Sequence, residues 1–168
     1  MTTPPDPQTL ARLRLLLLDF DGVMTDGLVY LDQEGKETVV CSRRDGLGIE
    51  RLRDAGIAVA VISREKNLVV ARRCEKLQIP CHQGIRDKIG VAKSVASEFN
   101  IDPGATAFMG DDVIDLEPMA WCALGIAPAD AIEQVLREAD WVTQRKGGRG
   151  AVREVADAIL DARAAIGR

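Results

Sequence analysis

The chain has 168 residues, of which 46% are hydrophobic and 29% charged, and its net charge is −4. This length and balance are typical of one globular domain and exclude a disordered or membrane-embedded chain. Lys and Arg are scattered among the acids and form no basic stripe, so nucleic acid is not an expected partner.

Membrane insertion and secretion are not expected either. The longest apolar run, at residues 15–18, is far shorter than the roughly 20 residues that span a bilayer. The first residues also lack the basic start of a secretion signal. The four cysteines show no zinc-ligand spacing, which favours buried free thiols. We therefore expect a cytoplasmic protein without a membrane partner.

The N-terminal third predicts a strand followed by a small flap. Residues 1–12 are Pro-rich and are expected to form a loose N-terminus of a domain that spans residues 1–168. The apolar run over 13–20 is typical of a strand that is covered on both faces. Residues 28–40 contain two short extended pieces around a turn-like Asp-Gln-Glu-Gly, which predicts a β-hairpin flap.

From Asp45 onward, helical and extended patterns alternate. The predicted helices span residues 45–56, 66–77, 88–99, 115–122, 131–139 and 151–165, and the predicted strands span residues 57–62, 79–82, 105–109, 123–126 and 141–143. This alternation predicts a doubly wound, Rossmann-like α/β fold with a parallel sheet and no room for a large cap domain. Such sheets bind ligands beyond the carboxyl ends of their strands.

Reactive side chains follow several of these predicted strands. Asp19 and Asp21 come after the first strand, Ser63 comes after the second, and Lys88 begins a helix. The sequence Gly-Asp-Asp-Val-Ile-Asp at 110–115 follows another strand. Acids at two strand ends would repel each other unless a cation joined them, and carboxylate oxygens are ligands that Mg²⁺ prefers. The pattern therefore indicates phosphoryl transfer, with a carboxylate nucleophile, a second acid for proton transfer, and Ser and Lys holding the phosphoryl oxygens.

These motifs resemble those of the haloacid dehalogenase phosphatase superfamily. The segment Asp-Phe-Asp-Gly-Val-Met-Thr-Asp-Gly at 19–27, Ser63, Lys88 and the segment 110–115 match the four superfamily motifs in order. Further segments resemble the capless branch that contains 3-deoxy-D-manno-octulosonate 8-phosphate phosphatases and nonulosonate 9-phosphate phosphatases. They lie at residues 44–49, 83–88 and 147–152.

The resemblance implies a role for each acid. Asp19 is the expected nucleophile and a metal ligand, and Asp21 is the expected acid/base, which binds the metal through its carbonyl group. Asp111 is expected to complete the Mg²⁺ site. Asp112 and Asp115 are expected to support it, and capping of the helix that Asp115 opens is an equal alternative for that residue.

The resemblance also implies a sugar phosphate substrate. The octulosonate enzymes commonly carry Gly-Arg-Lys after the second motif, whereas Glu65 with Arg73 and Lys76 resembles the nonulosonate 9-phosphate pattern. We therefore expect a nonulosonate 9-phosphate, with octulosonate 8-phosphate as the alternative. Arg73 and Lys76 also fit a solvated helix face. Arg149, in the Gly-rich segment 147–150, is expected to fold over the site.

Members of this branch form tetramers, so a homotetramer whose neighbouring subunits close the site is expected, with the hairpin at 28–40 as an interface element. Two other function classes remain open. A receiver domain of two-component signalling combines similar residues, but it places its phosphorylated Asp on a later strand. A non-catalytic tetramerisation module of sialate metabolism would retain the fold without turnover.

Overall fold

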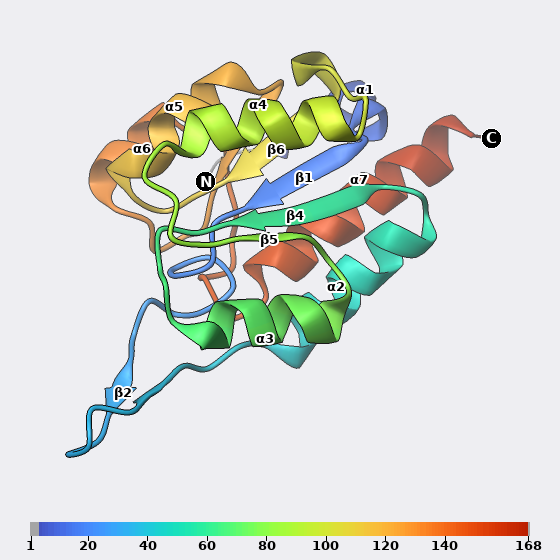
Figure 1. Cartoon of the computed structure of the whole chain (residues 1–168). Helices are drawn as coiled ribbons and strands as arrows, with labels where there is room; N and C mark the ends of the chain where they lie inside the picture. Colours follow the sequence, from blue (N-terminus) through green and yellow to red (C-terminus); the bar gives the residue numbers. More distant parts are fainter. Residues whose placement is uncertain (1–3, 168) are drawn as a thin grey trace.

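The computed structural model describes residues 4–167, in which helices cover both faces of a six-stranded parallel sheet (Figure 1). The strand order is β5-β4-β1-β6-β7-β8. This is the doubly wound α/β fold that the sequence predicted. The strands are β1 (Leu15–Leu18), β4 (Ala58–Ile62), β5 (Cys81–His82), β6 (Thr106–Met109), β7 (Leu124–Ala127) and β8 (Trp141–Val142).

Helices α2, α3 and α7 lie on one side of the sheet, and α4, α5 and α6 lie on the other (Figure 1). No helix within residues 4–167 is both long and apolar enough to cross a membrane. The helices are α1 (Pro7–Arg12), α2 (Arg43–Asp54), α3 (Leu68–Leu77), α4 (Lys88–Glu98), α5 (Leu116–Trp121), α6 (Glu133–Glu138) and α7 (Ala151–Ile166), with short 3-10 helices η1 (Pro103–Ala105) and η2 (Val113–Asp115).

The central strand β1 explains the continuous apolar run in the sequence. Leu16 and Leu18 pack into the core beneath α2 and α7, whereas Leu15 and Leu17 pack into the core beneath α4. All four side chains are fully buried. Because both faces of β1 are covered, every position in it is apolar, and the strand shows no alternation between polar and apolar residues.

The prediction of a loose N-terminus over residues 1–12 was wrong for residues 7–12, and residues 1–3 lie outside the described residues. Pro7 opens helix α1, where its fixed φ suits a first helical position. Leu10 is buried in the core cluster that also contains Ile159 of α7. The Arg163 guanidinium, also in α7, donates to the Leu13 carbonyl at 3.1 Å. Apolar burial against the C-terminal helix therefore orders this segment.

The predicted hairpin is present but its strands are shorter than expected. Strands β2 (Tyr30–Leu31) and β3 (Glu37–Thr38) pair antiparallel and project from the body of the domain (Figure 1). A bridge between Thr25 and Cys41 closes the base of the hairpin. Within residues 4–167 no cap domain accompanies it, so the pocket described below is bordered by short loops.

The register of the sheet brings three strand ends together. Leu18 of β1 pairs with Val61 of β4 and with Met109 of β6. The residues that follow these strands therefore emerge at one edge of the sheet. This alignment places the loops after β1, β4 and β6 around a common space.

Candidate active site

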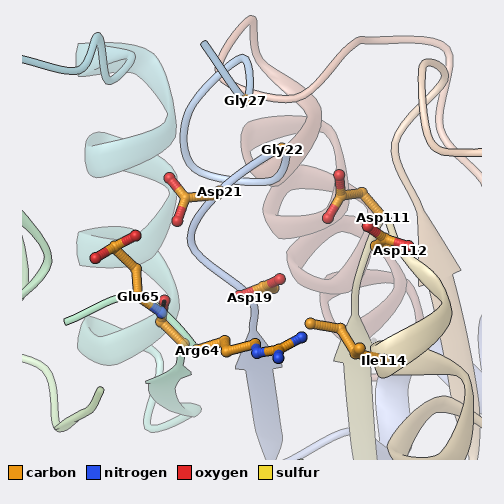
Figure 2. A pocket seen from close by; sticks show the side chains of 10 residues that line it. Asp19, Asp21, Gly22, Gly27, Arg64, Glu65, Asp111, Asp112 and Ile114 are labelled. Atoms are coloured by element: carbon orange, nitrogen blue, oxygen red, sulfur yellow. Dashed lines mark hydrogen bonds between the residues drawn. The ribbon is translucent and has the colours of Figure 1, made fainter. Parts of the chain in front are cut away.

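A pocket of about 470 Å³ lies at the carboxyl ends of β1, β4 and β6 (Figure 2). Asp19 and Asp21 line it from the loop after β1, and residues 63–65 line it from the loop after β4. Asp111 and Asp112 line it from the loop after β6. Loops from three parallel strands thus assemble the acids and the hydroxyl group that the sequence singled out, as expected for this edge of a doubly wound sheet.

Lys88 joins two buried carboxylates beneath this pocket. Its ammonium group lies 2.7 Å from Asp19 Oδ2 and 2.7 Å from Asp115 Oδ1. All three side chains are almost fully buried, so their charges interact in a poorly solvated environment. The backbone N–H of Phe20 donates to the other oxygen of Asp19 at 2.7 Å. These contacts fix the orientation of the Asp19 carboxylate.

Asp115 supports the site and does not cap helix α5. Its Oδ2 accepts hydrogen bonds from the backbone N–H groups of Asp111 and Asp112, at 3.2 and 3.3 Å. The Asp112 side chain caps the short helix η2 by accepting from the N–H of Val113 at 2.6 Å. Asp115 and Asp112 therefore shape the loop that carries Asp111. The helix that is capped is η2, and the capping residue is Asp112.

Three acids lie close enough together to hold a cation. One carboxylate oxygen each from Asp19, Asp111 and Asp115 lies within 4.8 Å of the others. Gly22, with φ of +75°, packs against the Asp111 carboxylate so closely that an added Cβ would lie 1.9 Å from Oδ2. The cluster consists of hard oxygen donors without His or Cys, which fits Mg²⁺.

The electrostatics of the cluster also fit a cation. Burial, followed by the charge of Asp115, raises the pKa of Asp19 to about 8. Burial and the charges of Asp115 and Asp112 raise the pKa of Asp111 to about 7. The single ammonium group of Lys88 does not balance the clustered carboxylates, so a divalent ion would relieve the remaining repulsion.

We expect Asp111→Asn to stabilise the metal-free protein at pH 8. The raised pKa of Asp111 means that its ionisation costs stability as the pH rises from the unfolded-state value of 3.8 through about 7. Asp111 is partly exposed, which reduces the effect, and a gain in Tm of about 3 °C corresponds to about 1 kcal/mol. Adding Mg²⁺ should raise the Tm of the wild type more than that of the variant. A lower Tm for the metal-free variant at pH 8 would contradict this account.

Asp21, Ser63 and Glu65 all line the pocket. Burial and the nearby charge of Glu65 raise the pKa of Asp21, which favours the protonated form that a proton donor needs. Glu65 lines the pocket, but its Oε1 also accepts from the backbone N–H groups of Lys66 and Asn67, at 2.6 and 2.8 Å. Glu65 therefore holds its own turn in place as well as bordering the pocket.

The expected basic residues lie outside the pocket of their own chain. Arg73 and Lys76 line a separate cavity of about 470 Å³ beside α2. The Arg73 guanidinium donates to the Ser42 carbonyl at 3.0 Å. Arg149 forms an ion pair with Asp26 at 2.9 Å. Their expected contacts with substrate remain predictions, since these contacts involve a neighbouring subunit or a movement of the segment at 147–150.

Arg64 and Gly22 were missed as candidate site residues. Both line the pocket. Arg64 could have been found because it stands between two residues that were selected, Ser63 and Glu65. The close approach of Gly22 to Asp111 joins loops that are far apart in sequence, so only the structure shows it.

Comparison with known proteins assigns the family. A family model described as haloacid dehalogenase-like hydrolase matches residues 82–155. The 3-deoxy-D-manno-octulosonate 8-phosphate phosphatase of Yersinia pestis is 42% identical over 154 residues, covering 91% of this chain and 82% of that protein. The chain belongs to the haloacid dehalogenase superfamily of phosphatases. This membership excludes the receiver-domain alternative.

Solved structures of this phosphatase superfamily support the assignment. A crystal structure of the Yersinia pestis octulosonate 8-phosphate phosphatase matches with a TM-score of 0.92 and 41% identity, over 94% of this chain and 86% of that one. The corresponding phosphatase of Moraxella catarrhalis, in complex with magnesium, phosphate and KDO, matches with a TM-score of 0.90 and 33% identity. That match covers 94% of this chain and 91% of the other. The metal and sugar acid belong to the Moraxella structure, whose fold this chain shares.

Proposed function

We propose that this chain is a Mg²⁺-dependent phosphatase that acts on the phosphate ester of a 2-keto-3-deoxy sugar acid, with 3-deoxy-D-manno-octulosonate 8-phosphate as the first candidate substrate. The observation that carries the proposal is the pocket in which Asp19, Asp21, Ser63 and Asp111 meet above Lys88. A relative with 42% identity bears the name of a phosphatase of that substrate.

The proposed reaction has two steps. The Asp19 carboxylate attacks phosphorus, and the bond from phosphorus to the sugar oxygen breaks as Asp21 protonates that oxygen. Asp21 then accepts a proton from water, which attacks the aspartyl-phosphate and frees both phosphate and Asp19. Ser63 and Lys88 hold the phosphoryl oxygens and the nucleophile in place. Asp19, Asp111 and the Asp21 carbonyl would hold Mg²⁺, which would supply positive charge against the phosphoryl oxygens.

Asp21→Asn is expected to slow hydrolysis by about 10²–10⁴-fold for a sugar phosphate, because the alcohol then leaves without a proton. The loss should be much smaller for an aryl phosphate, whose leaving group needs less protonation. Steady-state kinetics on both esters provides the test. Asp112→Asn is a matched control. Asp112 lines the same pocket, and Asn can replace it as a helix cap. If Asp21→Asn slows hydrolysis of both esters equally, Asp21 is not the proton donor.

A second candidate substrate is a nonulosonate 9-phosphate, which the sequence pattern favoured. The supporting observation is Glu65, which lines the pocket on the side of Asp21 (Figure 2). Replacing it by Gln keeps an oxygen for the N–H groups of Lys66 and Asn67 while removing the charge. Glu65→Gln should therefore alter sugar preference without unfolding the turn.

The test of function is phosphate release with Mg²⁺ from octulosonate 8-phosphate, a nonulosonate 9-phosphate, simple sugar phosphates and an aryl phosphate. A preference for octulosonate 8-phosphate that EDTA abolishes would support the first candidate. A preference for the nonulosonate ester, reduced in Glu65→Gln, would support the second. Release from none of them would favour the non-catalytic assembly module.

We further propose that the chain forms a homotetramer through its hairpin. Leu28, Tyr30 and Leu31 are 65, 64 and 66% exposed, which leaves apolar side chains of the first arm of the hairpin facing solvent. Leu31→Asp is expected to dissociate the assembly and lower kcat/KM, as measured by light scattering and kinetics. Glu34→Lys, at the polar tip of the same hairpin, serves as the control. A wild-type mass equal to the 18.2 kDa chain would contradict the proposal.

A further inference from the structure

The turn after β4 provides a fixed base for the side chains that enter the pocket. The N–H of Glu65 donates to Ser63 Oγ at 3.1 Å. The carbonyl groups of Ser63 and Glu65 accept from the N–H groups of Ile85 and Gly84, at 3.0 and 2.9 Å. Both residues that flank Arg64 are therefore tied to the segment after β5. The backbone from which the Arg64 side chain extends is held in place.

The Arg64 side chain itself is free. It lines the pocket and is exposed, and its guanidinium forms no ion pair or hydrogen bond with any residue in the range 4–167. Figure 2 shows it extending from the end of β4 past Asp19 in the direction of Ile114, which lines the same pocket. The charge of Arg64 therefore has no partner within the described part of the chain.

The charges around the pocket indicate what this arginine could bind. Five carboxylates line the pocket, from Asp19, Asp21, Glu65, Asp111 and Asp112. The ammonium group of the lysine beneath them already pairs with two carboxylates, at 2.7 Å each. Of the residues that the structure describes along this pocket, Arg64 is the only cationic one. An anionic substrate that enters this acidic pocket therefore meets one unpaired protein cation, the guanidinium of Arg64.

We propose that Arg64 binds the phosphoryl group of the substrate, an inference that rests on the proposed phosphatase function. Arg64 directly follows Ser63 and lines the same pocket as the proposed nucleophile Asp19, so its guanidinium can reach a phosphoryl group bound there. The planar fork of a guanidinium matches two phosphoryl oxygens, and its charge is retained at every working pH. In a pocket without a cap domain, this side chain supplies a positive charge from the same chain and offsets the repulsion by the surrounding acids.

The test compares Arg64→Gln and Arg64→Lys with the wild type, and uses Lys66→Gln as a matched control from the same turn. The measurements are kcat/KM for octulosonate 8-phosphate and for an aryl phosphate, and competitive inhibition by inorganic phosphate. Arg64→Gln should lower kcat/KM about tenfold for both esters and raise the phosphate Ki about tenfold, the effect of losing a charge-assisted hydrogen bond. Arg64→Lys should recover part of both losses, and Lys66→Gln should stay within about twofold of the wild type.

Two outcomes would overturn the proposal. A loss confined to the sugar acid ester, with an unchanged phosphate Ki, would assign Arg64 to the sugar carboxylate. Wild-type values in Arg64→Gln would make it a solvated side chain. If the wild type hydrolyses no ester, the proposed function fails, and calorimetric binding of inorganic phosphate with Mg²⁺ then tests Arg64 separately. Tenfold weaker binding in Arg64→Gln would still support the contact, and equal binding would refute it.

Discussion

Asp19→Asn is expected to lose at least about 10⁴-fold in phosphate release, because an amide oxygen cannot form the aspartyl-phosphate. The variant should remain folded. Asn keeps the size of the side chain and an oxygen for the N–H of Phe20. The turnover loss should appear with every ester, including an aryl phosphate, because each ester must form the same aspartyl-phosphate on Asp19.

Rapid acid quenching with labelled substrate provides the direct measurement for Asp19. The wild type should carry a base-labile label that turns over within seconds, and Asp19→Asn should carry none. Circular dichroism and Tm confirm that the variant is folded. Because Asn can deamidate to Asp, Asp19→Ala is a second variant that cannot regain the carboxylate. Near wild-type turnover in Asp19→Ala would refute the proposed nucleophile.

Lys88→Met is expected to destabilise the metal-free protein by about 3–5 kcal/mol and to abolish activity. The substitution leaves the buried carboxylates of Asp19 and Asp115 without the ammonium group that now lies 2.7 Å from each. Uncompensated buried charge is costly, and the apolar Met side chain cannot replace the lost hydrogen bonds. In a chain of this length the Tm should fall by about 10 °C.

A double variant separates charge from packing at Lys88. Adding Asp115→Asn removes one of the two unpaired carboxylates and should recover part of the lost Tm, which a purely steric defect would not allow. Lys93→Met, on the exposed face of the same helix α4, should leave the Tm within about 1 °C of the wild type. If Lys88→Met unfolds no more easily than Lys93→Met, the buried ion pairs do not hold this site together.

Much of the fold could be predicted because the local signals agree with the tertiary contacts. The apolar run around β1 and the alternating patterns that follow it predict a parallel sheet, and the structure has one. The predicted ends of helices and strands were less accurate than the predicted elements themselves. Helix α3 begins at Leu68, because the Asn67 side chain caps it. The helix at the N-terminus could not be predicted, because Leu10 packs in a core cluster with residues of α7 that lie about 150 positions later in the chain.

The sequence by itself identified the candidate groups: two acids proposed for nucleophilic attack and proton transfer, a hydroxyl group, a lysine and a third acid, each at a strand end or helix start. Local patterns suffice for this because strand ends of a parallel sheet converge by topology. Only the tertiary structure decided which of these groups contact one another. It pairs Lys88 with Asp115 as well as Asp19, places Gly22 against Asp111, and leaves Arg64 without a partner among residues 4–167. Those relations depend on distances between loops that are remote in sequence, and no local pattern encodes them.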